Sequence, residues 1–345
     1  MKKTARLEAL RVLALMHDYM VPPDDTDGID VIEAPWKMEF DIISHLEDMG
    51  HQVRKVGVKD DLGVIRQAIQ DFAPQIVFNL MESFDEVGVF DQNVVSYLEL
   101  MKTPYTGCNP RGLMLSRDKA LARTLLASHR IPGPEFAVVR MGRVPRVQKR
   151  LPFPLIVKSL TQEASIGIAQ ASIVSDEAAL RERVAFIHQS IGTDAIVERY
   201  IEGRELYVGV LGNFRLRVLP VWEINFAGMP EGAYRIASGR VKWNDAYREK
   251  YGIMTGPADL PAEITRRVQH LAKRVFRTLD LSGYARIDLR LTADGRVYVL
   301  EANPNPQLAY GEDFAEAAEH AGISYESLLQ RILGLGLRWR PGLAG

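Results

Sequence analysis

YARIDLRLTADGRVYVLEAN, residues 284–303, carries the most informative pattern of this sequence. Tyr284 to Leu291 and Val297 to Glu301 are both strand-like, and the intervening TADG favours a tight turn. We therefore predict a β-hairpin in which these two segments pair.

Four polar side chains of this hairpin form a candidate site. Arg286 and Asp288 share one face of the first strand, and Glu301 and Asn303 share one face of the second, because alternate residues of a strand point the same way. Pairing across the turn can bring the two faces into register. Two carboxylates, an amide oxygen and a guanidinium suit Mg²⁺ ions that also hold phosphates. A solvated cross-strand pair of arginine with a carboxylate explains the same pattern.

Strand-like and helix-like segments alternate in the first part of the chain. Strands are expected over 9–16, 53–58 and 75–80, and helices over 38–49 and 62–72. This alternation predicts a parallel sheet with helices on its faces, and ligands of such sheets bind beyond the carboxyl ends of the strands. Residues 79–88 follow one of these ends.

The later segments predict a second unit that begins near Ser116. Helices are expected over 113–127, 176–190, 261–279 and 325–333, and strands over 155–158, 168–174, 195–197 and 206–211. Residues 220–256 have no clear period, and such a long loop is usually functional or mobile.

Composition excludes several classes of protein. With 345 residues, 47% hydrophobic and 25% charged, the chain is expected to form two or three globular domains. Its net charge of -1 offers no basic field for nucleic acid, so we expect no such partner. The longest stretch without charge, 164–175, is shorter than the ~20 residues that span a bilayer. Cys108 is the single cysteine, which favours a reducing cytoplasm.

A lysine and a loop of small residues form a second candidate feature. Lys158 ends an apolar strand, and residues 162–167 after it allow backbone N–H groups to approach a phosphate. A lone lysine at a strand end is more often solvated than a ligand, but the loop after Lys158 favours a ligand. The glycine-rich signatures of P-loop and dinucleotide-binding proteins are absent, as are HExxH and GxSxG. The sequence therefore contains none of these motifs that would indicate a hydrolase or a dehydrogenase.

Seven segments in order resemble the ATP-grasp superfamily, and within it the D-alanine–D-alanine ligase family. They are 77–80 leading to Gly88, 104–107, 116–119, 156–158, 197–205, 285–288 and 300–303. The resemblance implies an α/β fold with a parallel N-terminal domain over 1–115, a central lid subdomain over 116–205 and a catalytic subdomain over 206–345, the latter two clasping ATP. It implies that ATP phosphorylates a carboxylate and that an amine attacks the acyl phosphate, which leaves an amide, ADP and phosphate.

The resemblance also implies a role for particular residues. ATP would be held by Lys119, Lys158, Glu198, Tyr200, Ile201 and Glu205. Two Mg²⁺ ions, replaceable by Mn²⁺, would be held by Asp288, Glu301 and Asn303. Arg286 would stabilise the tetrahedral intermediate, Lys242 would lie near the transferred phosphate, and Ser165 would belong to the lid loop. Positioning and charge neutralisation are what phosphoryl transfer requires. A homodimer is what the family suggests.

The substrate pocket departs from the family pattern. The lid serine and its tyrosine partner correspond to Ala164 and Trp243, and residues 17–20 contain no match for the expected glutamate. The expected histidine corresponds to Glu82, and the serine that holds the acceptor carboxylate corresponds to Glu312, whose charge would repel a carboxylate.

We therefore predict small-molecule carboxylate and amine substrates other than two D-alanines, with Glu82, Trp243 and Glu312 in a pocket that favours a cationic partner. Acidic residues on a loop are also explained by solvation alone. A D-alanine–D-alanine ligase with a changed triad and a non-catalytic ATP-binding module are the alternatives.

Overall fold

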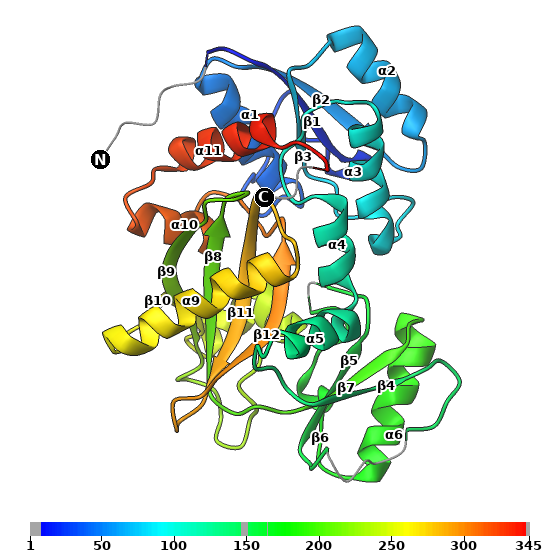
Figure 1. Ribbon diagram of the computed structural model, residues 1–345, viewed down its shortest axis with the longest axis vertical. Coiled ribbons are helices and arrows are strands. Elements are labelled where there is room, and N and C mark those ends of the chain that lie inside the picture. Colours follow the sequence, from blue (N-terminus) through cyan, green and yellow to red (C-terminus); the bar gives the residue numbers. More distant parts are fainter. Residues whose placement is uncertain (1–7, 146–150, 164, 343–345) are drawn as a thin grey trace.

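The computed structural model describes residues 8–145, 151–163 and 165–342, which form three sheets flanked by helices (Figure 1). The first sheet is parallel, with strand order β2-β1-β3 and bounds β1 Arg11–His17, β2 Gln52–Val58 and β3 Ile76–Asn79. The predicted parallel sheet is therefore confirmed. Its helices are α1 Lys37–Asp48, α2 Leu62–Phe72 and α3 Asp91–Leu100. Residues 79–88 do follow the carboxyl end of a strand, as the pattern predicts.

A four-stranded antiparallel sheet, ordered β4-β7-β5-β6, occupies the middle of the chain. Its elements are β4 Phe136–Val139, β5 Leu155–Ser159, β6 Ile173–Val174 and β7 Ala195–Arg199, with α6 Glu177–Phe186 and the turn η4 Ile187–Ile191. The strand predicted over 168–174 is reduced to its last two residues, because a short helical turn, Gln170–Ser172, precedes them.

The single helix predicted over 113–127 is wrong, since two helices cover this part of the chain. They are α4 Pro110–Arg117 and α5 Lys119–Ser128. Asp118 interrupts them because its backbone is extended and its carboxylate caps α5 by accepting a hydrogen bond from the Leu121 N–H. This cap places Lys119 at the start of a helix instead of within one.

The third sheet has five antiparallel strands in the order β10-β9-β8-β11-β12. Its elements are β8 Arg204–Leu211, β9 Arg217–Asn225, β10 Met254–Pro257, β11 Tyr284–Leu291 and β12 Val297–Pro304. The predicted hairpin is confirmed as β11 and β12. The long loop predicted over 220–256 is partly wrong, because β9, β10 and the helices α7 Gly239–Trp243 and α8 Asp245–Lys250 lie in it. Leu219, Val221 and Trp222 of β9 are buried, but the hydrophobic residues there follow no clear period from which a strand could be predicted.

Helices cover the five-stranded sheet and join it to the first sheet. They are α9 Ala262–Thr278, α10 Asp313–His320 and α11 Tyr325–Arg338, of which α10 was not predicted. Figure 1 shows α11, near the end of the chain, beside the N-terminal sheet. Gly336 permits this contact, because a Cβ there would lie 2.3 Å from the Tyr105 carbonyl oxygen. Among the described residues no helix is long and apolar enough to cross a membrane.

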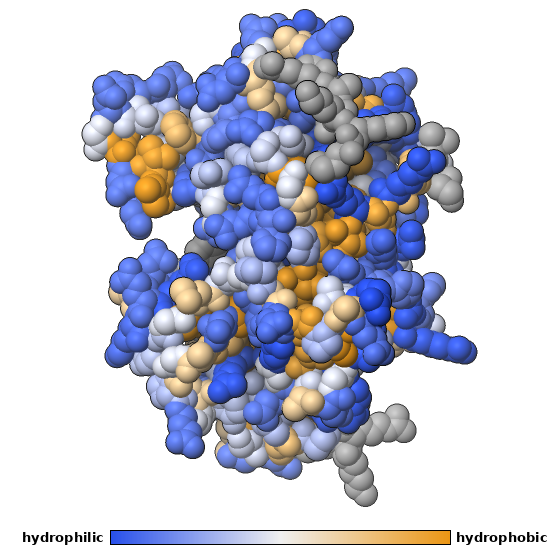
Figure 2. Space-filling view, turned by 90° about the vertical axis from the view of Figure 1, so that its left-hand side faces the viewer, coloured by the Kyte–Doolittle hydropathy of each residue, from blue (hydrophilic) through white to orange (hydrophobic). Residues whose placement is uncertain are grey.

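One side of the molecule is indented. Figure 2 shows a lobe at the upper left of this side, with a notch beneath it that separates it from the body. The visible surface is mainly hydrophilic, and apolar residues gather near its middle and on that lobe.

Glu39, in the first turn of α1, is a buried carboxylate that should make stability depend on pH. It is 1% exposed, its Oε2 meets no hydrogen-bond partner in the described part of the chain, and burial raises its pKa from 4.5 to about 7. Between these two values the folded chain keeps a proton that the unfolded chain releases, so stability falls as pH rises through this window. We expect Glu39→Gln to be more stable than the parent by about 2–3 kcal/mol at pH 8 and almost equal to it near pH 4.

Urea unfolding at the two pH values measures this difference. Glu47→Gln, an exposed substitution in the same helix, is the control and should leave the pH dependence unchanged. An equal stability gain for Glu39→Gln at both pH values would show that the carboxyl does not hold its proton in the folded state.

Candidate active site

The β11–β12 hairpin brings the four predicted polar residues together. Asp288 lies directly opposite Glu301, and Arg286 lies opposite Asn303. The register shifts immediately after Asp288, so the irregularity in the ladder adjoins the carboxylate pair. The juxtaposition predicted from the alternation of side chains is therefore confirmed.

Asp288 is held by its neighbours on both strands. Arg286 donates to its two oxygens from Nε at 2.8 Å and Nη2 at 3.0 Å, and the Asn303 amide donates at 2.9 Å. Burial alone would lower the pKa of Arg286, but the Asp288 carboxylate outweighs this effect and raises it. The guanidinium also lies over the Tyr207 ring, 4.6 Å from its centroid. Arg286 is therefore a fixed positive charge.

Glu301 is surrounded by lysines from distant parts of the chain. The Lys119 Nζ lies 3.4 Å from its Oε1 and donates at 2.6 Å to the Gln162 carbonyl oxygen. Burial would raise the pKa of Glu301, but the charges of Lys119, Lys158 and Lys242 hold it below its usual value. The carboxylate is consequently ionised at neutral pH in a concentrated positive field, which is an environment suited to phosphate groups.

The oxygen donors of this hairpin match the chemistry of a hard cation. Asp288, Glu301 and Asn303 offer carboxylate and amide oxygens from adjacent strands, the ligands that Mg²⁺ prefers. In the ranges that the structure describes, no three His, Cys, Asp or Glu side chains gather as a metal site. A cation here would therefore take the two carboxylates together with the amide oxygen or with phosphate oxygens.

Glu198 on β7 forms two buried ion pairs. It is 1% exposed and contacts the Lys158 Nζ at 2.8 Å and the Arg123 Nε at 2.7 Å. Burial would raise its pKa, yet these two cations lower it to about 2. Arg123 also donates to the Val299 carbonyl at 2.6 Å and to that of Leu300. Arg123 was missed, although it follows Lys119 by one helical turn and so shares its face.

The other residues expected at the nucleotide lie on the adjoining elements. Tyr200 packs its ring edge-on against Tyr234, with centroids 5.3 Å apart, and Ile201 is buried. Glu205 on β8 accepts hydrogen bonds from Arg290 at 2.7 Å and from the Tyr207 hydroxyl at 3.1 Å. The Ser165 hydroxyl donates to the Ala237 carbonyl at 2.7 Å.

The expected substrate residues are not brought together by any contact that we observe. Glu82 follows β3 and Glu312 precedes α10, and both are exposed. Trp243 ends α7, but its side chain lies outside the described residues, as does Ala164.

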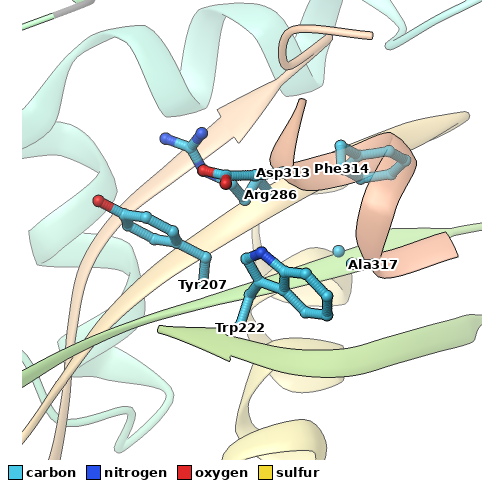
Figure 3. A pocket seen from close by; sticks show the side chains of 7 residues that line it. Tyr207, Trp222, Arg286, Asp313, Phe314 and Ala317 are labelled. Carbon is cyan, nitrogen blue, oxygen red and sulfur yellow. The ribbon is translucent and has the colours of Figure 1, made fainter. Parts of the chain in front are cut away.

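A small pocket beside Arg286 contains residues that sequence reasoning missed. Tyr207, Gly209, Trp222, Asp313, Phe314 and Ala317 line it together with Arg286. Figure 3 shows the Asp313 carboxylate next to Arg286, with the Trp222 ring below them. No periodic signal marked this pocket, because Trp222 lies in the part of β9 whose sequence has no clear period and Asp313 lies in the unpredicted helix α10.

Known proteins are similar to this chain over most of its length. A family model described as D-ala D-ala ligase C-terminus matches residues 125–334. An uncharacterized protein of Sinorhizobium fredii, y4sG, is 30% identical over 315 residues, which are 88% of this chain and 89% of that protein. A D-alanine–D-alanine ligase of Desulforudis audaxviator is 30% identical over 297 residues, 85% of this chain and 90% of that enzyme.

A solved structure gives the same result for the fold. The D-alanine–D-alanine ligase of Bacillus anthracis complexed with ATP has a TM-score of 0.73 at 22% identity, covering 96% of this chain and 98% of that one. The fold and the lysine–carboxylate cluster define an ATP-grasp protein, which is a class of ATP-dependent, ADP-forming ligases. Within this class, the chain belongs to the D-alanine–D-alanine ligase family. The resemblance seen in the sequence is thereby confirmed.

Proposed function

We propose that this chain joins a carboxylate to an amine through an acyl phosphate formed from ATP, with two Mg²⁺ ions as cofactors. The observation that carries the proposal is Glu301, which lies opposite Asp288 and 3.4 Å from the Lys119 ammonium. A cluster of carboxylates and lysines suits a reaction in which charge moves between phosphate oxygens.

The residues of this cluster have separate tasks in the proposal. Lys119, Lys158 and Lys242 neutralise the phosphate charge of the nucleotide, and Glu198 keeps Lys158 in place. Arg286, fixed by Asp288, stabilises the negative charge that develops when the amine attacks the acyl phosphate. Mg²⁺ bound by Asp288, Glu301 and Asn303 would supply further charge neutralisation at the phosphates.

The nucleotide base and ribose are assigned to the strand end that follows Glu198. Tyr200 and Ile201 would face the adenine edge, and Glu205 would accept a ribose hydroxyl beside Arg290. The loop that contains Ser165 would cover the phosphates. These assignments rest on the family motif and on the closeness of β7 and β8 to the lysine–carboxylate cluster.

We infer that the substrates are other than two D-alanines. Glu82 and Glu312 stand at positions where the family has substrate-binding residues, and carboxylates there would repel a substrate carboxylate. Asp313 lies beside Arg286 in the small pocket. Such an environment favours a partner that carries a cationic or amine group. Ligation of two D-alanines is the second candidate, and the names of the relatives favour it.

ADP release with ATP and Mg²⁺ distinguishes these candidates. We expect activity in a pool of L-amino acids, of D-amino acids without D-alanine, or of small amine–carboxylate pairs, with mass spectra to identify the product. Activity with D-alanine alone would establish the second candidate instead. ATP binding without ADP release in any pool would favour a non-catalytic module. The double variant Ala164→Ser, Trp243→Tyr should gain D-alanine ligation if these two positions set the specificity.

A further inference from the structure

Arg117 lies where three separate parts of the chain meet, and the proposed reaction does not use it. It is the last residue of α4, which stands between the N-terminal sheet and the four-stranded sheet (Figure 1). Its side chain is only 12% exposed. A buried guanidinium needs several partners to offset its loss of hydration, so the identity of those partners is informative.

The partners of Arg117 come from two different loops. Its Nη2 pairs with the carboxylate of Asp91, the first residue of α3, and its Nη1 lies 3.0 Å from the Glu163 Oε2. The guanidinium also lies against Gly88, where a Cβ would be 3.3 Å from Nη1. One side chain therefore contacts both the segment after β3, residues 80–91, and the loop after β5, whose described residues are 160–163 and 165–168.

Arg117 and its two carboxylate partners depend on one another for their counter-charges. Burial would lower the pKa of Arg117, but Glu163 and Asp91 outweigh it and raise that pKa, so the arginine stays charged. Burial raises the pKa of Glu163 to about 7 despite the charge of Arg117, so this ion pair forms fully only above neutral pH. Asp91 is 5% exposed and depends on Arg117 for its counter-charge. Glu163 adjoins Gln162, whose carbonyl accepts the hydrogen bond from Lys119. Arg117 is thus connected, through Glu163 and the adjoining Gln162, to Lys119 of the lysine–carboxylate cluster.

We propose that Arg117 is a positioning residue that couples the loop after β3, where a substrate would enter, to the loop after β5, which would cover the nucleotide. Its ion pair with Glu163 holds the second loop down, and Asp91 sets the position of the arginine. This inference rests on the proposed function in one respect: it takes the loop after β3 as the substrate loop and the loop after β5 as the nucleotide loop.

Hydrogen exchange in the nucleotide-free protein tests the ion pair directly. At pH 8, Glu163→Gln keeps the shape of the side chain and removes its charge, so amides of residues 160–163 and 165–168 should exchange about three- to tenfold faster. With Mg²⁺ and a non-hydrolysable ATP analogue, the dissociation constant should rise by a similar factor. Glu177→Gln is the matched control, because its pair with Arg181 is 60% exposed on both sides and should have no effect on this loop.

The coupling has its own test at Asp91. Asp91→Asn should also speed exchange in residues 160–163 and 165–168, and combining it with Glu163→Gln should add nothing, since both act through Arg117. If Asp91→Asn does not fold, Arg117→Lys, which has one nitrogen for two carboxylates, should give the same faster exchange.

Unchanged exchange in Glu163→Gln, or fully additive effects in the double variant, would overturn the coupling. Because these measurements need no turnover, a failure of the proposed ligase reaction would appear separately, as the absence of ADP release from the parent protein.

Discussion

Glu301→Gln should reduce Mg²⁺-dependent ADP release at least about a thousandfold while the chain remains folded. The substitution keeps the shape of the side chain but removes a charge that lies opposite Asp288 and 3.4 Å from the Lys119 ammonium. Glutamine also lacks the anionic oxygens that a hard cation prefers. The loss should therefore affect the chemical step and the metal dependence of nucleotide binding together.

Two measurements check this expectation. ADP release is followed in the most active substrate pool, and calorimetry with a non-hydrolysable ATP analogue gives the Mg²⁺ concentration needed for binding. Glu263→Gln, an exposed change in the first turn of α9, is the control and should match the parent in both. Undiminished ADP release from Glu301→Gln would remove this carboxylate from the metal site.

Arg123→Met should lower the free energy of unfolding by about 3 kcal/mol. The arginine is 6% exposed, and its loss leaves the Glu198 carboxylate buried with Lys158 as its remaining partner. The carbonyl groups of Val299 and Leu300, next to Glu301, lose their donors at the same time. A buried acceptor that loses its donor destabilises the fold by more than the intact hydrogen bond stabilises it.

Urea denaturation measures this loss, and Arg199→Met on the same strand as Glu198 is its control. Arg199 pairs with Glu135 at 3.6 Å, but the two side chains are 42% and 55% exposed, so its loss should cost less than about 0.5 kcal/mol. A similarly small cost for Arg123→Met would mean that Lys158 alone satisfies Glu198.

The sequence was most informative where structure follows from local pattern. The parallel sheet and α2 follow from runs of apolar residues and helical spacing. The pairing of Asp288 with Glu301 follows from a hairpin whose turn and strand period are both local. The break at Asp118 was also local, but a helix cap within a continuous apolar spacing was overlooked.

Family resemblance carried the functional prediction further than these patterns did. It assigned the motifs that contain Lys119, Lys158, Glu198 and Glu301 to a single ATP site. Composition and periodicity alone indicated only an α/β chain with a candidate metal site. The structure pairs Lys119 with Glu301 and Lys158 with Glu198, but the role of each in the reaction stays a prediction that the variants above examine.

The sequence by itself thus determined the parallel sheet, the β11–β12 hairpin and the face on which the hairpin carboxylates lie. Only the tertiary structure decided which charges meet: Arg123 with Glu198, Lys119 with Glu301, and Arg117 with Asp91 and Glu163. The physical reason is the separation along the chain of the residues that interact. Strand alternation, helical period and turns depend on residues a few positions apart, whereas a buried ion pair forms only when packed cores bring distant segments together.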